Sequence, residues 1–348
     1  MKVVILWWTK WFWEWLAKYI HKNFNSEAEI LITGRDTEAW NKIEKDFWIN
    51  FTVCNKEAVK NADVVIFSVP ISITERVIEE VSPYLKEDVV MLDVTSIKKW
   101  PAEAMKKFAP KNALVIPTHP MFWPFITEIS GQIIVLTAEE EDRNDKRYIS
   151  LKNYLSSRQA KVVEVSSEEH DKMMSIVQWL THFNMFVLAW TMEKVGIDLH
   201  KTYEFVSPIY KILVSSVWRY IHQNPWLYAD IQMNNEENLD VYSAYLDTVS
   251  EFLKNIEEKD YESFVDNVAT SKKYFWDEAI SGQVYTDKII HLIWKQTRIA
   301  KDSLNKVVKF ENIYTGDILE DELVSFDSDF FVTKDNSKLK FDEWEIIK

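Results

Sequence analysis

The hydrophobic pattern of the first 165 residues alternates short apolar runs with longer amphipathic stretches. The runs are β-branched, continuous and closed by polar residues or proline, which is typical of buried strands in a parallel sheet. The stretches between them, notably residues 10–22 and 73–85, have helical spacing. This alternation predicts a parallel sheet with right-handed crossovers. The predicted strands are Lys2–Leu6, Glu29–Thr33, Asp63–Val69, Val89–Asp93 and Leu114–Pro117, with Ile133–Leu136 and Lys161–Val165 at an edge.

From about Ser167 the pattern becomes helical, which predicts an all-α domain. We therefore expect an α/β fold, a Rossmann-like doubly wound parallel sheet, followed by that helical domain. The expected domains are residues 1–165 for dinucleotide binding, 166–305 for substrate binding and dimerisation, and 306–348 as an acidic extension. The extension is either a fragment of a further domain or a partly ordered tail. The predicted helical segments are Ser167–Val195, Tyr203–Gln223, Asn238–Glu257, Tyr261–Ile280 and Thr286–Leu304.

Length and charge narrow the class of protein. A chain of 348 residues suits two domains. Its net charge of −14 argues against a broad nucleic-acid surface. No run approaches the ~20 apolar residues of a membrane span, and the N-terminal run is too short for a signal peptide. The single Cys54 excludes an internal disulfide, and the histidines show no metal-ligand spacing. We expect a cytoplasmic protein without a metal, nucleic-acid or membrane partner.

The chain has far fewer glycines and more tryptophans than a protein of ordinary composition. Ordinary usage of ~7% would give roughly 24 glycines in this length. The chain has five glycines and 16 tryptophans. Residues 6–17 follow the first predicted strand and read LWWTKWFWEWLA. With glycine at positions 7, 8, 11 and 13 this becomes a phosphate-binding turn that opens a helix.

Tryptophan at those four positions removes the space that a dinucleotide needs. Glycines allow a tight turn, close backbone approach to the pyrophosphate and close packing of helix on strand. An indole fills that volume and covers the backbone N–H groups, and overpacking costs ~1–3 kcal/mol per site. We expect Trp7, Trp8, Trp11 and Trp13 to obstruct the cofactor phosphate site. The vestigial cofactor-binding residues are Thr9 and Lys10 in the turn, with Arg35 and Asp36 after the second strand as candidates for the ribose or its 2′-phosphate.

Three further segments carry a resemblance to a known family. They are DVTSIK (residues 93–98), THPMFWP (118–124) and QWLTHF (178–183). Together with the VVIFSVP strand (64–70), the chain resembles the archaeal type of prephenate dehydrogenase over roughly residues 1–300. This resemblance implies NAD(P)-dependent oxidative decarboxylation of prephenate to 4-hydroxyphenylpyruvate, in tyrosine biosynthesis. It implies NAD or NADP as cofactor, prephenate or arogenate as substrate and a homodimer formed through the helical domain.

The resemblance also assigns catalytic roles. His119 matches the base that accepts the proton of the substrate hydroxyl, for which imidazole is suited. Ser96 would orient that histidine or the hydroxyl, and Lys98 would support the loop or the substrate's charge. His182 would face the active site from the helical domain, and Lys211 would pair with a substrate carboxylate. Trp123 and Trp179 stand where the family pattern has glycine, and Trp48, Trp100 and Trp218 stand where glycine reads more naturally.

These observations leave four hypotheses. The first is a prephenate-dehydrogenase-like scaffold that is inactive or severely impaired, with cofactor binding lost or strongly weakened. The second is an active prephenate or arogenate dehydrogenase with a rearranged turn. The third is a non-catalytic protein that binds partners through an aromatic surface. The fourth is a chain that does not fold stably, since native stability is only ~5–15 kcal/mol.

Overall fold

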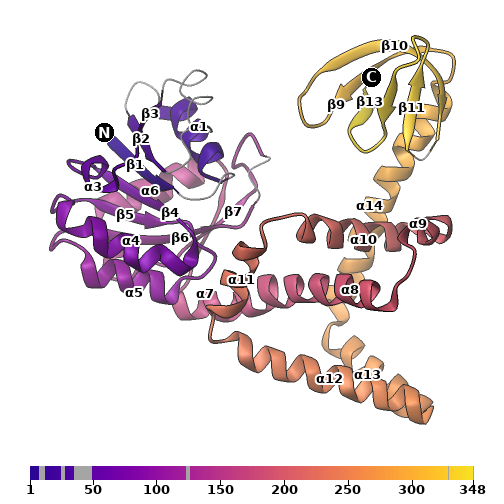
Figure 1. Cartoon of the computed structure of the whole chain (residues 1–348), viewed down its shortest axis with the longest axis horizontal. Helices are drawn as coiled ribbons and strands as arrows, with labels where there is room; N and C mark the ends of the chain where they lie inside the picture. The colour runs from indigo at the N-terminus through magenta and orange to yellow at the C-terminus, as the bar shows by residue number, and fades with distance from the viewer. Residues whose placement is uncertain (8–11, 25–27, 35–48, 123–125, 328, 348) are drawn as a thin grey trace. The chain divides into compact units, whose positions relative to one another are not determined.

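The computed structural model describes residues 1–7, 12–24, 28–34, 49–122, 126–327 and 329–347, and only the backbone of Trp7 and Trp13. Its first part is a doubly wound α/β fold (Figure 1). Eight strands form one sheet in the order β3-β2-β1-β4-β5-β6-β7-β8. They are β1 Lys2–Trp7, β2 Glu29–Thr33, β3 Asn50–Thr52, β4 Val64–Ser68, β5 Val90–Asp93, β6 Leu114–Pro120, β7 Ile133–Leu136 and β8 Lys161–Glu164.

Helices cover both faces of this sheet because its strands are apolar on both sides. On one face, Val3 and Ile5 pack with residues of α1 (Phe12–Phe24) and α6 (Lys146–Ser157). On the other, Val4 and Leu6 pack with α3 (Asn55–Ala58), α4 (Thr74–Val81) and α5 (Lys99–Phe108). Short 3₁₀ turns at Ile71–Ile73, Ser82–Tyr84 and Asp142–Asn144 complete the connections. The predicted Rossmann-like fold class is confirmed.

Two strands differ from the sequence prediction. The strand predicted to end at Pro117 continues to Pro120, because Thr118, His119 and Pro120 pair with β7. That pairing is antiparallel. The six strands on the β6 side of this pairing, β3, β2, β1, β4, β5 and β6 in spatial order, are mutually parallel. The short β3 has no apolar run to reveal it and was not predicted. The extension of β6 has a functional consequence, since it places His119 in a strand and not in a loop.

The helical region begins after β8. Ser166 caps α7 (Ser167–Met174), and a π-helical stretch, Ser175–Leu180, joins it to α8 (Thr181–Val195). The chain then forms α9 (Leu199–Thr202), a 3₁₀ turn (Tyr203–Phe205), α10 (Pro208–Ile221) and α11 (Pro225–Met233). The segment predicted as helical from Tyr203 starts its main helix only at Pro208, since Ser207 accepts the N–H of Tyr210 as a cap and proline suits the first turn.

Three longer helices follow, α12 (Asn238–Glu258), α13 (Tyr261–Tyr274) and α14 (Trp276–Asp302). The predicted break between Ile280 and Thr286 is wrong, because α14 runs through Gly282 without interruption and the break lies at Phe275. A single glycine inside a helix costs only about 1 kcal/mol, which a long helix tolerates.

The described residues of the acidic extension form a small antiparallel sheet. Its strands are β9 Val307–Asn312, β10 Ile318–Phe326, β11 Phe330–Thr333, β12 Lys338–Lys340 and β13 Trp344–Ile347, in the order β12-β11-β10-β9-β13. Phe310, Leu323, Phe331 and Ile346 form its core with Ala300 of α14. Backbone packing divides the chain into two compact units, Met1–Leu246 and Asp247–Lys348. The three-domain boundaries at 165 and 305 stay a prediction.

Candidate active site

The candidate site lies at the carboxyl edge of the first sheet. Strand order reverses between β1 and β4, and open α/β sheets bind ligands outside the carboxyl ends of strands at such a point. The ends of β1, β5 and β6 bring Trp7, Asp93 and His119 to this edge. The residues predicted from DVTSIK and THPMF therefore meet where the fold predicts a ligand.

The loop after β5 is built around a buried ion pair. Asp93 Oδ2 accepts hydrogen bonds from Lys98 Nζ, from the hydroxyl of Thr95 and from the Thr95 backbone N–H. Lys98 Nζ also donates to the carbonyl of Thr118, at 2.8 Å. The side chains of Asp93 and Lys98 are fully buried, and this burial lowers the pKa of Lys98. Lys98 thus links the loop after β5 to β6, while the choice between its two predicted roles stays a prediction.

His119 lies within a chain of hydrogen bonds. Its Nδ1 is 2.8 Å from Nε2 of His170, and Nδ1 of His170 is 2.7 Å from Oδ1 of Asp171. Asp171 in turn accepts the backbone N–H groups of Lys98 and Lys99, at 2.7 and 2.9 Å, where α5 begins. The two histidine rings meet edge to face, with centroids 5.1 Å apart. The catalytic candidate is thus tied to α7 and α5 as well as to its own strand.

Burial disfavours the charged form of both of these imidazoles. Desolvation lowers the pKa of His119 well below its usual value, and the nearby His170 and Lys98 lower it further. The pKa of His170 is also lowered by desolvation, although Asp171 opposes that shift. A neutral imidazole can accept a proton, so the surroundings of His119 suit a general base.

The π-helical stretch places Gln178 against the other nitrogen of His119. The amide nitrogen of Gln178 is 3.2 Å from His119 Nε2. Short π segments inside helices occur frequently at functional sites. Trp179, the next residue, is buried between Phe183 and Tyr242, with ring centroids 5.1 and 4.0 Å away. In the described structure its indole packs within the helical region.

His182 lies one turn beyond Gln178, in an aromatic cluster. Its ring centroid is 4.9 Å from that of Tyr220 and 5.0 Å from that of Tyr228. Desolvation lowers the pKa of His182 to about 4. Its Nδ1 is buried without a hydrogen-bond partner among the described residues. Tyr228 also packs with Ile97 of the DVTSIK loop, so the cluster adjoins the site.

The remaining candidate residues have no described hydrogen bond to His119. Ser96 is half-buried beside the loop and hydrogen-bonds to no described residue, His119 included. Lys211 is half-buried in α10. Trp100 of α5 packs against the cluster that contains Ile97 and Tyr228. The roles predicted for Ser96, His182 and Lys211 stay predictions.

The cofactor residues fall largely outside the described part of the chain. The structure does not describe residues 8–11, which include Trp8, Thr9, Lys10 and Trp11. It also does not describe residues 35–48, which include Arg35, Asp36 and Trp48, or residues 123–125, which include Trp123. At the start of α1, Phe12 and Trp15 pack against Phe122, and Trp15 Nε1 donates to the carbonyl of Ile126, at 2.6 Å. Residues 7–13 contain no glycine. The predicted obstruction of the cofactor phosphate site lies largely outside the described residues and stays a prediction.

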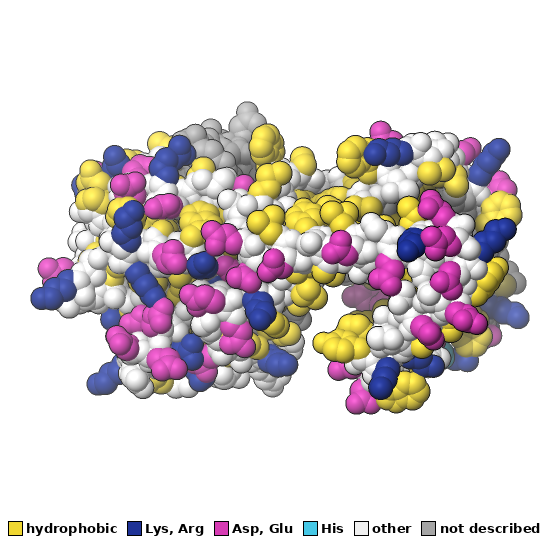
Figure 2. Space-filling model, turned by 90° about the horizontal axis from the view of Figure 1, so that it is seen from below, with side chains coloured by type: hydrophobic (Ala, Val, Ile, Leu, Met, Phe, Trp, Pro, Cys, Tyr) yellow, Lys and Arg dark blue, Asp and Glu magenta, His cyan; other side chains and the backbone are white. Residues whose placement is uncertain are grey.

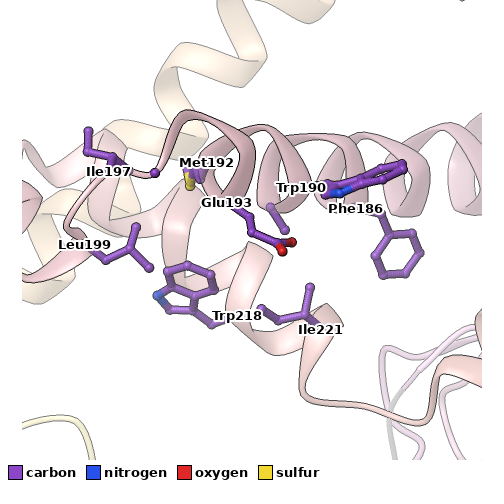
Figure 3. Close-up of a pocket in the computed structure, with 10 residues that line it drawn as sticks. Phe186, Trp190, Met192, Glu193, Ile197, Leu199, Trp218 and Ile221 are labelled. Carbon is purple, nitrogen blue, oxygen red and sulfur yellow. The ribbon is translucent and has the colours of Figure 1, made fainter.

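A separate apolar cavity of about 500 Å³ lies between α8 and α10 (Figure 3). Trp190, Trp218 and Phe186 line it, and Glu193 supplies its one carboxylate. It shares no residue with the hydrogen-bond chain of His119, so we do not assign the reaction to it. Among the described residues, no three His, Cys, Asp or Glu side chains gather as a metal site, and none of the described helices has the length and apolar content to cross a membrane.

Sequence reasoning missed His170, Asp171 and Gln178. The signal for the first two was available, since both lie in the first turns of the helix that starts at Ser167, directly after the Ser166 cap. Gln178 was within a quoted motif but had no predicted role, because its approach to His119 depends on the π-helical stretch.

Family comparisons agree with this geometry. Residues 16–164 match the prephenate dehydrogenase nucleotide-binding domain, and residues 166–270 match the prephenate dehydrogenase dimerization domain. The chain belongs to the prephenate dehydrogenase family. The first match begins at residue 16, beyond the tryptophan-rich turn.

Individual relatives support the same assignment. The chain is 36% identical over 326 residues to a probable arogenate/prephenate dehydrogenase of Methanocaldococcus jannaschii, covering 93% of this chain and 72% of that protein. It is 34% identical over 217 residues to the T-protein of Haemophilus influenzae, covering 62% of this chain and 56% of the T-protein. Among solved structures, the Aquifex aeolicus prephenate dehydrogenase in complex with hydroxyphenyl propionate and NAD+ has a TM-score of 0.63 at 19% identity, covering 80% of this chain and 98% of that one, which shows the fold.

Proposed function

We propose that this chain carries the catalytic framework of a prephenate or arogenate dehydrogenase and that, with tryptophan in its phosphate turn, it is inactive or severely impaired. The framework is His119, buried and neutral at the carboxyl edge of the sheet. The impairment follows from the absence of glycine among residues 7–13. The observation that carries the proposal is the buried His119 at the sheet edge, in a chain that has tryptophan at four expected glycine positions of the phosphate turn.

In this proposal His119 Nε2 accepts the proton of the substrate hydroxyl. That atom is the ring nitrogen not engaged with His170, and its described neighbour is the amide of Gln178. Lys211 is the proposed partner of a substrate carboxylate, since Lys98 is fully committed to Asp93 and Thr118. The substrate class is a small hydroxylated acid of the prephenate type, and the cofactor of the family is NAD or NADP.

The test is prephenate- and arogenate-dependent formation of NADH or NADPH. We expect none from the chain as it stands and clear activity when Trp7, Trp8, Trp11 and Trp13 are all changed to glycine. Adding His119→Ala to the glycine variant should abolish that activity again. Activity of the unchanged chain would refute the obstruction, and a glycine variant that binds cofactor but acts on neither acid would refute the framework.

The proposal includes a homodimer. In the helical part of the first unit, Trp190, Phe205 and Trp226 expose 62%, 85% and 78% of their surfaces. Exposed apolar patches of this kind mark interaction sites, and the matched helical family domain is described as a dimerization domain. Figure 2 shows apolar side chains gathered between acidic and basic ones on one face. Sedimentation should give a dimer, and Trp226→Ser should weaken it if α11 contributes, whereas a monomer at all concentrations would contradict this assembly.

A further inference from the structure

The hydrogen bonds around His119 can be followed from Asp171 through His170 to His119. Asp171 accepts two backbone N–H groups of α5, so its carboxylate is held in place by the start of that helix. Oδ1 of the same carboxylate is 2.7 Å from Nδ1 of His170. A carboxylate only accepts hydrogen bonds, so His170 must carry its proton on Nδ1. The neutral His170 then has its lone pair on Nε2.

That lone pair determines the proton position on the next ring. His170 Nε2 is 2.8 Å from His119 Nδ1, so His119 must donate there and carry its own proton on Nδ1. Its Nε2 is left with the lone pair. The charged groups around the two rings are Lys98, Asp93 and Asp171, all buried with them.

We propose that His170 and Asp171 are positioning residues that fix the tautomer of His119, so that Nε2 is the atom offered to the substrate hydroxyl. The catalytic use of this tautomer rests on the proposed function. The tautomer itself follows from the hydrogen bonds and does not depend on that function. A histidine acts as a base only through its unprotonated nitrogen, and a buried ring in the wrong tautomer presents an N–H instead. The arrangement also explains why the catalytic strand, α7 and the start of α5 share one set of hydrogen bonds.

The experiment is NMR of the protein labelled with ¹⁵N in its histidine rings, with the His119 signals assigned by their loss in His119→Gln. We expect His119 to be neutral near pH 7, with protonated Nδ1 and unprotonated Nε2. His170→Phe keeps a ring but removes the acceptor, and should release His119 to the opposite tautomer or to a mixture. His170→Gln restores a carbonyl acceptor and should preserve the original tautomer. His222→Gln, at the exposed end of α10, is the matched control and should leave the His119 signals unchanged.

Two results would overturn the inference: Nε2–H on His119 in the unsubstituted chain, or an unchanged tautomer in a folded His170→Phe variant. Both NMR measurements are made without cofactor or substrate. A glycine variant that binds no cofactor would therefore defeat the proposed function while leaving this result intact.

A different observation, the tryptophan in the cofactor turn and in the chain as a whole, carries a second inference. Tryptophan and glycine counts of 16 and five together give 21, close to the roughly 24 glycines expected for this length. Tryptophan is highly buried on average, yet Trp190, Trp226, Trp276 and Trp294 each expose more than half of their surface. Meanwhile the polar residues of the DVTSIK and THPMF segments are present in the chain. Mutations that accumulate in an inactive enzyme would replace glycine with many residue types and not with tryptophan alone.

We infer that most of these tryptophans are glycine in the protein as its native host makes it. A UGA codon is decoded as tryptophan by some translation systems and as glycine by others, so a single difference in decoding would exchange the two residues throughout. Trp15 serves as an internal contrast, because its indole N–H donates a hydrogen bond to the carbonyl of Ile126.

The gene and the native protein test this directly. We expect UGA codons at more than half of the 16 tryptophan positions, 7, 8, 11, 13, 123 and 179 among them, a UGG codon at Trp15, and glycine at the UGA positions by peptide mass spectrometry of the host's protein. UGG at the turn positions, or tryptophan in the native peptides, would overturn the inference. A glycine turn that still bound no cofactor would instead count against the proposed function.

Discussion

The ammonium of Lys98 and the carboxylate of Asp93 form an ion pair from which solvent is excluded, since neither side chain has any exposed surface. The pair holds the loop after β5 against β6, through the second hydrogen bond of Lys98 to the Thr118 carbonyl. It therefore fixes the strand end that carries His119. In the structure Lys98 links the loop after β5 to the strand that carries His119.

Lys98→Met should destabilise the protein by about 3–5 kcal/mol, because it leaves the charge of Asp93 buried without its partner. Replacing both partners, in Asp93→Leu with Lys98→Met, should cost less than the single change, since no unpaired charge remains. Urea unfolding of the three proteins measures this difference. A loss below about 1 kcal/mol in the single variant would contradict the buried pair.

His182 should make stability depend on pH. Its folded pKa of about 4 lies below the usual value of 6.5, because burial disfavours its charged form. Between those two pH values the unfolded chain binds more protons at this residue, so the contribution of His182 to stability falls as pH drops from 6.5 to 4 and is constant below that. The loss amounts to roughly 3 kcal/mol at most.

His182→Leu removes the titrating group while keeping an apolar side chain between Tyr220 and Tyr228. Its unfolding free energy, measured by urea titration at several pH values, should decline less steeply between pH 6.5 and 4 than that of the unsubstituted protein. His119 and His170 contribute to the slope of both proteins and cancel in the comparison. Identical slopes would show that His182 is not buried as the structure describes.

The small C-terminal sheet should respond to changes in its own core. Phe310 of β9 is fully buried in the core of this sheet, and Phe→Ala at such a site costs about 3–5 kcal/mol. In hydrogen exchange, Phe310→Ala should lose protection across residues 307–347 while strands β1 to β6 keep theirs. Equal loss in both regions would contradict the division into two compact units.

Much of the fold follows from the sequence because its signals are local. The strands Lys2–Leu6 and Glu29–Thr33 are apolar runs whose identity needs no long-range information. The extra residues of β6 depend on pairing with β7, and the helical start at Trp276 depends on a break that no proline or glycine marks. Such features arise from tertiary contacts that periodicity does not encode.

The residues of the candidate site also fall into two groups, those that a sequence motif identifies and those that only tertiary contacts bring together. His119 could be named from its motif, because the motif carries the resemblance. His170 and Asp171 lie 51 or more positions away in sequence, and only the approach of α7 to β6 brings them to it. Gln178 reaches the ring through a π-helical stretch that helical spacing alone would not predict.

The most direct test of this account is calorimetric titration of NAD and of NADP into two proteins, the chain as it stands and the variant with Trp7, Trp8, Trp11 and Trp13 changed to glycine. Trp15→Phe, which alters a tryptophan of α1 outside the phosphate turn, is the matched control. We predict no binding at sub-millimolar cofactor for the unchanged chain and for the control, and clear binding of one cofactor by the glycine variant. Sub-millimolar binding by the unchanged chain, or none by a folded glycine variant, would contradict it.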